Sequence, residues 1–195
     1  MNARIAPVSA PRSPLFNLLL GILALGWPLA AHVLLPHLGA WPLLVAILAL
    51  AWWRLPAARR GWGWVLLIAG GALIAAGHAE FGVRAWPVVL NAAMLAVFAH
   101  SLARGPSVIE RLARRREPAL GPRGVRYTRR VTQAWCVFFL VNGSIALWTA
   151  LYADMATWTL YNGGIVYALL AMMFLGEWLI RRRVKSRPEE TPHDR

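Results

Sequence analysis

Cysteine and acidic residues are scarce in this sequence. Cys136 is the only cysteine, which excludes an intramolecular disulfide and a cysteine-based metal site. It falls within an apolar run, where a thiol is more often a small hydrophobe than a nucleophile. The histidines form neither an H-x-x-x-H nor an H-E-x-x-H pattern, so we expect no metal ion and no cofactor.

Long stretches of the chain also lack charge. With 58% hydrophobic residues and a mean hydropathy of +0.50, the chain is too apolar for an ordinary soluble domain. A spanning helix needs about 20 apolar residues, so there is no room for a separate soluble catalytic domain. We predict an all-α membrane protein with six transmembrane helices, approximately Leu15–Leu35, Leu38–Trp53, Trp62–His78, Trp86–Ala103, Thr132–Ala153 and Thr157–Ile180.

Positive charge is almost missing from one side of this arrangement. With the N-terminus inside, twenty of the 21 Lys and Arg residues fall on the inner side, and only Arg84 lies outside. Positive charge near the end of a span resists translocation, so cytoplasmic loops carry an excess of Lys and Arg. We therefore expect both termini in the cytoplasm. The net charge of +13 then favours anionic lipid headgroups as partners, and we expect no nucleic-acid partner.

The six segments also divide the chain. Residues 1–14 are expected to form a cytoplasmic leader, and residues 181–195 a basic cytoplasmic tail. Between them, residues 15–180 form the transmembrane domain, with a basic cytoplasmic loop over residues 104–131. The first segment imitates a secretory signal but exceeds the apolar core of about 7–15 residues that a signal has. Retention as a signal anchor is favoured, and cleavage would leave five spans in the same orientation.

The basic loop is the one sizeable segment outside the membrane. Ser107 and Glu110 have the spacing of a capping box, which marks the start of a helix. Val108, Ile109 and Leu112 then share one face, which predicts a short amphipathic helix on the inner leaflet. A docking helix for a soluble partner is the alternative. The candidate residues for binding a partner or lipid are Arg111, Arg114, Arg115, Arg116 and Arg129.

Amide and phenol side chains within the spans are candidates for function, because a polar group in hydrocarbon needs a partner. Asn142 lies near the middle of the fifth segment, so it should bond another helix or line a polar cavity. Asn91 and Asn162 each lie five residues into an inward-running segment. They should therefore sit at about the same shallow depth, with Tyr161 nearby.

Titratable residues near the ends of the spans have simpler explanations. Glu80 and Arg84 are four residues apart and should pair in the outer loop. On the inner side, Glu177 precedes Arg181 by four residues, which favours an ion pair at the cytoplasmic interface. His100 is the other inner candidate.

The last third of the chain, residues 127–183, combines aromatic and amide residues in a distinctive order. The marked positions are Tyr127-Thr128-Arg129, Ala134-Trp135, Phe138-Phe139, Asn142, Trp158, Tyr161-Asn162 and Gly176-Glu177. In these features the segment resembles an uncharacterised family of small bacterial inner-membrane proteins. Its members are encoded beside acyl carrier proteins, acyltransferases and dehydratases of aryl-polyene and xanthomonadin-type pigment clusters. The resemblance implies an inner-membrane component of polyene or fatty-acyl lipid biogenesis; the first four spans share it only in general character.

Some members of that family are labelled ketosynthases, and these residues do not support such an activity. A condensing enzyme needs a reactive cysteine with two histidines, or with a histidine and an asparagine, beside oxyanion donors in a soluble fold. Here Cys136 lies within a span and the histidines lie on other segments.

Three functions remain open. The leading hypothesis is a non-catalytic component that anchors or organises acyl-chain enzymes, for which an acidic carrier protein or an acyltransferase would be the partner of the basic loop. The second is a small transporter or flippase subunit for a lipid-like product, although essentially only Asn142 lies between two polar ends. The third is a membrane enzyme acting on a lipid-linked substrate, with Glu177, His100 or the outer histidines as acid or base.

Overall fold

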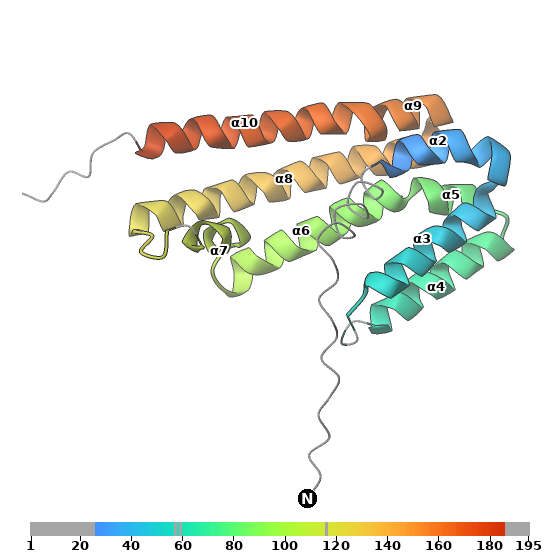
Figure 1. Ribbon diagram of the computed structural model, residues 1–195, viewed down its shortest axis with the longest axis horizontal. Helices are drawn as coiled ribbons and strands as arrows, with labels where there is room; N and C mark the ends of the chain where they lie inside the picture. The colour runs from blue at the N-terminus through green and yellow to red at the C-terminus, as the bar shows by residue number, and fades with distance from the viewer. Residues whose placement is uncertain (1–25, 57, 59, 116, 186–195) are drawn as a thin grey trace, which may run out of the picture.

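Helices account for all the regular structure in the part of the chain described by the computed structural model, residues 26–56, 58, 60–115 and 117–185 (Figure 1), which confirms the all-α prediction. The predicted leader and the first half of the first span lie outside these residues. The elements in chain order are α2 (Trp27–Leu38), α3 (Ala40–Arg54), α4 (Arg60–Ala75), α5 (Ala79–Arg84), α6 (Trp86–Arg104), α7 (Val108–Arg114), α8 (Pro122–Tyr152), α9 (Met155–Leu160), the π-helical turn η2 (Tyr161–Ile165) and α10 (Val166–Lys185).

Among the described residues, three helical segments are long and apolar enough to cross a membrane. They are Trp86–Arg104, Pro122–Tyr152 and Met155–Leu179, the last made of α9, η2 and most of α10. The apolar helices over Ala40–Trp53 and Arg60–Ala75 are shorter. Large apolar side chains are exposed along the longer helices, as in α8, where Val137 and Leu140 keep more than half of their surface. Length, composition and this outward apolar surface indicate a membrane protein.

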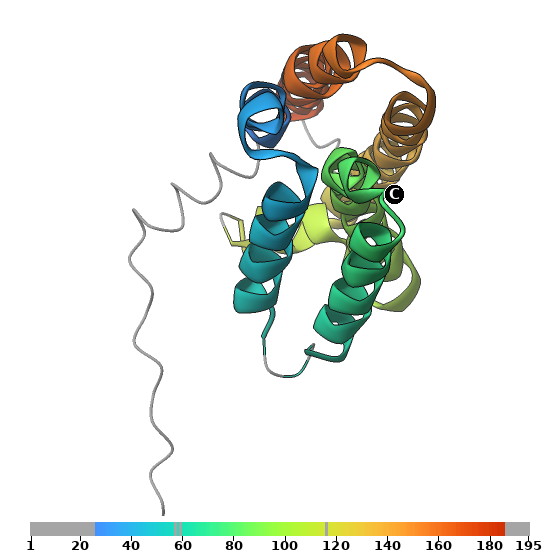
Figure 2. The ribbon, with the colours of Figure 1, turned by 90° about the vertical axis from the view of Figure 1, so that its right-hand side faces the viewer.

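Two groups of helices are visible (Figure 1). The helices α6, α8 and α10 run alongside one another, while α3 and α4 form a hairpin on the other side of α6. In the view along the bundle (Figure 2), α2 lies next to α9, and α8 lies on the opposite side from α2. Of all these pairs, α6 and α8 make the most extensive contact.

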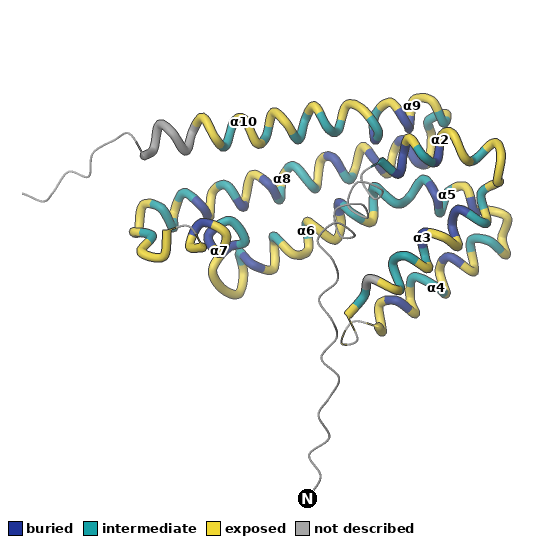
Figure 3. The backbone as a smooth tube through the Cα atoms, in the orientation of Figure 1, coloured by how far each residue is buried: buried dark blue, intermediate teal, exposed yellow. Residues whose placement is uncertain are grey.

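The buried apolar core lies at the end of the bundle where α2, α3, α5, α8 and α9 meet (Figure 3). Trp158 of α9 and Val83 of α5 are completely buried there, and Trp27 of α2 packs beside them. Aromatic side chains of this size bury a large apolar area, so Trp27 and Trp158 contribute strongly to this core.

Helix starts follow local sequence rules. Proline occupies the first or second position of α2, α6 and α8, where its missing N–H would be unpaired in any case. Gly39 separates α2 from α3 with a φ of +77°, a conformation that favours glycine. The helix α8 differs from the prediction: it begins at Pro122 rather than at Thr132, so the end of the basic loop is helical.

Candidate functional site

Three side chains from three different helices form a hydrogen-bonded network inside the bundle. The amide nitrogen of Asn142 in α8 donates to the amide oxygen of Asn91 in α6 at 3.0 Å. The hydroxyl of Tyr161, at the start of η2, donates to the amide oxygen of Asn142 at 2.9 Å. Both asparagines are buried. The prediction that Asn142 bonds another helix is confirmed, and Asn142 joins the three longest apolar segments at one point.

Asn91 and Asn162, which were expected at about the same depth, both line the groove described below but bond different partners. Asn162 instead donates from its amide nitrogen to the hydroxyl of Thr149 in α8 at 3.1 Å and to the carbonyl oxygen of Trp158 at 2.9 Å. Equal depth along two helices does not decide which faces meet, because rotation about each helix axis sets that separately. Asn91 turns toward Asn142, and Asn162 toward the C-terminal end of α8.

The π-helical turn η2 explains how two consecutive polar residues both reach α8. A π-turn closes its hydrogen bonds over five residues instead of four, so each residue advances by a smaller angle around the axis. Tyr161 and Asn162 both reach α8, where they bond Asn142 and Thr149 respectively. The two glycines that follow, Gly163 and Gly164, were the sequence signal for such an irregularity, and the sequence analysis missed it.

An apolar groove lies against this network. Its volume is about 260 Å³, and its walls come from α2, α6, α8, η2 and α10. Asn91, Asn142 and Asn162 supply polar groups, and the remaining lining is apolar or aromatic. The other lining residues are Pro28, Trp86, Pro87, Leu90, Met94, Phe138, Phe139, Val166, Tyr167 and Leu170.

A second hollow, of about 460 Å³, lies on the other side of Phe138 and Asn142. It separates α8 from the η2 and α10 segment, and Tyr161, Met172 and Met173 are among the residues that line it. Between the two hollows, the segment made of η2 and α10 contacts α8 through side chains that include Tyr161. Apolar hollows between the helices of a bundle are among the places where small molecules bind proteins.

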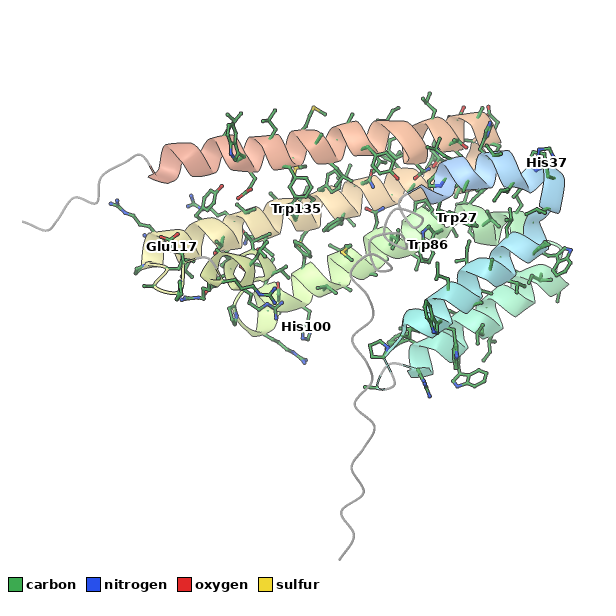
Figure 4. All side chains as sticks on the ribbon, viewed as in Figure 1. Trp27, His37, Trp86, His100, Glu117 and Trp135 are labelled. Atoms are coloured by element: carbon green, nitrogen blue, oxygen red, sulfur yellow. The ribbon has the colours of Figure 1, made fainter. Side chains whose placement is uncertain are left out.

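Aromatic side chains pack on the side of Asn142 that is nearer to the start of α8. The ring of Trp135 lies within 5.1 to 6.3 Å, centre to centre, of Phe98 in α6, Phe138 and Phe139 in α8, and Phe174 in α10. Such offset or edge contacts add to the stabilisation from burial. Trp135 (Figure 4) and Asn142 lie seven residues apart on α8, and both are buried.

Arg84 anchors the opposite end of α8. The predicted pair with Glu80 is present at 3.6 Å, but the guanidinium also donates to the carbonyl oxygens of Thr149, at 2.7 Å, and Ala153. These carbonyls belong to the last turn of a helix, where the negative end of the helix dipole favours a cation. The indole nitrogen of Trp158 donates in turn to the Arg84 carbonyl at 3.1 Å. The one basic residue assigned to the outer side is thus largely engaged with α8.

The inner candidates do not join the network. The hydroxyl of Tyr127 donates to the backbone carbonyl of Glu177 at 3.1 Å, which ties the start of α8 to α10. His100 is exposed at the α7 end of α6, far from Trp86 at the other end of that helix (Figure 4). The side chain of Arg181, the expected partner of Glu177, lies outside the described residues, as does all of Arg116. Among the described residues, no group of His, Cys, Asp and Glu side chains could hold a metal ion.

The short helix α7 differs from the prediction in its orientation. Ser107 caps it by accepting from the backbone N–H of Glu110 at 3.2 Å, as the capping box requires. The carboxylate of Glu110, however, is buried and pairs with Arg114 at 2.9 Å, while Leu112 is exposed. The helix α7 packs on α8 and turns Glu110 and Ala113 inward, and its placement on the inner leaflet stays a prediction.

Seven other arginines near α7 are exposed. We call this set the basic platform. It is carried by the end of α6, by α7 and by the first turns of α8, and it consists of Arg104, Arg111, Arg115, Arg123, Arg126, Arg129 and Arg130.

No family model, no curated protein and no solved structure matches this chain.

Proposed function

We propose that this chain is a six-span protein of the bacterial inner membrane with both termini in the cytoplasm. The three candidate spans and the shorter apolar helices α3 and α4 support this arrangement, with α2 as the end of the first span. The basic platform gathers at the end of the bundle where α6, α7 and α8 meet, and charge of this sign at one end favours the cytoplasmic side (Figure 1).

Within that membrane we propose a non-catalytic role in acyl-chain biogenesis, in which the basic platform binds an acidic cytosolic protein. The carrying observation is that seven arginines are exposed on adjoining elements, whereas Arg114 is held by Glu110. Exposed like charges attract an acidic partner and speed its association. The resemblance to pigment-cluster proteins supports an acyl carrier protein, which is acidic, or an acyltransferase as that partner.

The test is direct binding of a purified acyl carrier protein to the full chain in nanodiscs of neutral lipid. Replacing Arg111, Arg115 and Arg126 together by alanine should weaken binding on the order of tenfold and flatten its dependence on salt. The matched control replaces Arg60, Arg187 and Arg195, which removes the same charge from the predicted inner side but leaves the basic platform intact. Binding by the control variant should stay close to that of the unchanged chain.

Two results would overturn this role. One is equal binding by both triple variants, which would mean that net charge alone matters. The other is the absence of carrier-protein binding to the chain in nanodiscs of neutral lipid. Because removing inner-side charge disturbs insertion, both variants must first be shown to keep the orientation of the unchanged chain.

A further inference from the structure

The arginines of the basic platform lie on three helices that pack against one another. The helices α6 and α8 make the most extensive contact among the described elements, and α7 packs on both of them (Figure 1). Glu110 and Ala113 of α7 are buried, although this helix has only seven residues. The backbone that carries the arginines therefore belongs to the packed bundle.

Ser101 connects α6 to α7 across the turn between them. Its hydroxyl accepts a hydrogen bond from the backbone N–H of Val108, the first residue of α7, at 3.2 Å. The same hydroxyl donates to the carbonyl oxygen of Phe98, in its own helix, at 2.7 Å, and Ser101 is only 5% exposed. The N–H groups in the first turn of a helix have no partner within that helix, so Ser101 supplies one from a neighbouring helix. This hydrogen bond fixes the start of α7 relative to the end of α6.

Two further contacts hold the short helix α7 together. Ser107 caps its first turn, and the guanidinium of Arg114 pairs with the buried carboxylate of Glu110 within the helix. Arg111 lies in this helix and Arg115 directly follows it, and both are exposed. Their backbone positions are therefore set relative to the arginines of α6 and α8.

We propose that the basic platform fits a folded acidic surface, on which the carboxylates have a fixed spacing, and that Ser101 is the positioning residue that keeps α7 in place for it. This inference rests on the proposed function, because it concerns the partner of the same platform. A preorganised site loses little conformational freedom on binding, and a folded partner cannot rearrange to follow a displaced helix. A flexible polyanion adapts to many arrangements of positive charge, so its binding does not depend on where α7 is held.

The test compares two acidic probes on the full chain in nanodiscs of neutral lipid. One is a purified acyl carrier protein, which is folded, and the other is poly-L-glutamate, which is flexible at neutral pH. Ser101→Ala should weaken binding of the carrier protein about three- to tenfold, through faster dissociation, and should change binding of poly-L-glutamate by less than about twofold. The salt dependence of carrier binding should stay as in the unchanged chain, because no charge is removed.

Controls separate the position of α7 from the substitution itself. Ser144→Ala is the matched change, since the Ser144 hydroxyl bonds Leu140 within α8, and it should leave the binding of both probes unchanged. Ser101→Thr keeps the hydroxyl and should restore carrier binding. A spin label at Leu112, an exposed residue of α7, in a chain with Cys136→Ala, reports on the helix without any partner. Its mobility should rise in Ser101→Ala and not in Ser144→Ala.

Should Ser101→Ala fail to fold, Ser107→Ala removes the cap of α7 and should produce the same difference between the two probes. The inference is overturned by equal weakening of both probes, by unchanged carrier binding in Ser101→Ala, or by weaker carrier binding without a change in the mobility of the label at Leu112. Absence of carrier binding to the unchanged chain contradicts the proposed function itself, and this inference falls with it. The three other outcomes contradict the inference alone.

Discussion

Asn142 is the side chain that joins the three longest apolar segments. Replacing it with leucine removes a donor from Asn91 and an acceptor from Tyr161 in one step. We expect Asn142→Leu to lower the free energy of unfolding by about 0.6 to 2 kcal/mol, the range for hydrogen bonds between transmembrane helices. The melting temperature in a mild detergent, followed by circular dichroism, measures the change.

Ser144 provides the control at the same scale. Its hydroxyl is exposed and donates within its own helix to the carbonyl of Leu140 at 2.9 Å, so Ser144→Ala should change stability by less than about 0.5 kcal/mol. A melting temperature for Asn142→Leu equal to that of Ser144→Ala would show that the network contributes nothing to stability. The double variant Asn91→Leu with Asn142→Leu should cost less than the sum of its single changes, because they share one hydrogen bond.

At the scale of an element, α9 depends on a cap that senses pH. Asp154 caps this helix by accepting from the backbone N–H of Thr157 at 2.7 Å, and this hydrogen bond is the main cause that lowers the pKa of the carboxyl below its ordinary 3.8. A lowered pKa in the folded state means that the ionised cap stabilises the fold above pH 3.8. That stabilisation is lost as the pH falls through the folded-state pKa.

We therefore expect Asp154→Ala to melt at a lower temperature than the unchanged chain at pH 7, and the difference to shrink as the pH falls below 3.8. Melting curves across this range in one detergent measure it. Asp154→Asn keeps an acceptor for Thr157 but cannot titrate. The cap should therefore contribute nothing to the change of its melting temperature with pH. A difference between Asp154→Ala and the unchanged chain that stays constant to pH 3 would contradict the role of the ionised cap.

At the scale of the whole molecule, the proposed six-span topology makes a two-sided prediction. In a chain with Cys136→Ala, single cysteines introduced at Pro36, Gly82 and Asp154 should react with a membrane-impermeant maleimide added to intact cells or spheroplasts. Cysteines introduced at Gly121 and Ser186 should react only after the membrane is opened. The physical reason is the segregation of arginine: twenty of 21 basic residues share one side in this arrangement.

Gly121 decides the matter, because it lies at the start of α8 beside the basic platform. Labelling at Gly121 from outside would reverse the topology and would place the platform away from any cytosolic partner. Labelling at Gly82 only after opening the membrane would contradict the pairing of α4 and α6 as successive spans.

The sequence by itself determined what depends on neighbours along the chain. Apolar length set the long helices, the start of α6 at Trp86 was predicted, and the spacing of Ser107 and Glu110 set the cap of α7. The four-residue spacing of Glu80 and Arg84 was likewise enough to predict their contact. In each case, the interacting groups are held within one helical turn, so helix geometry alone brings them together.

Only the tertiary structure decided which distant groups meet. The need of Asn142 for a partner followed from its place in an apolar span, but Asn91 is 51 residues away and its selection depends on how α6 and α8 are rotated against each other. The same holds for the guanidinium of Arg84 on the carbonyls of α8, and for the buried side of α7. The π-turn at η2 shifts Tyr161 and Asn162 off the helical period, so the groove beside them was invisible to any count along the sequence.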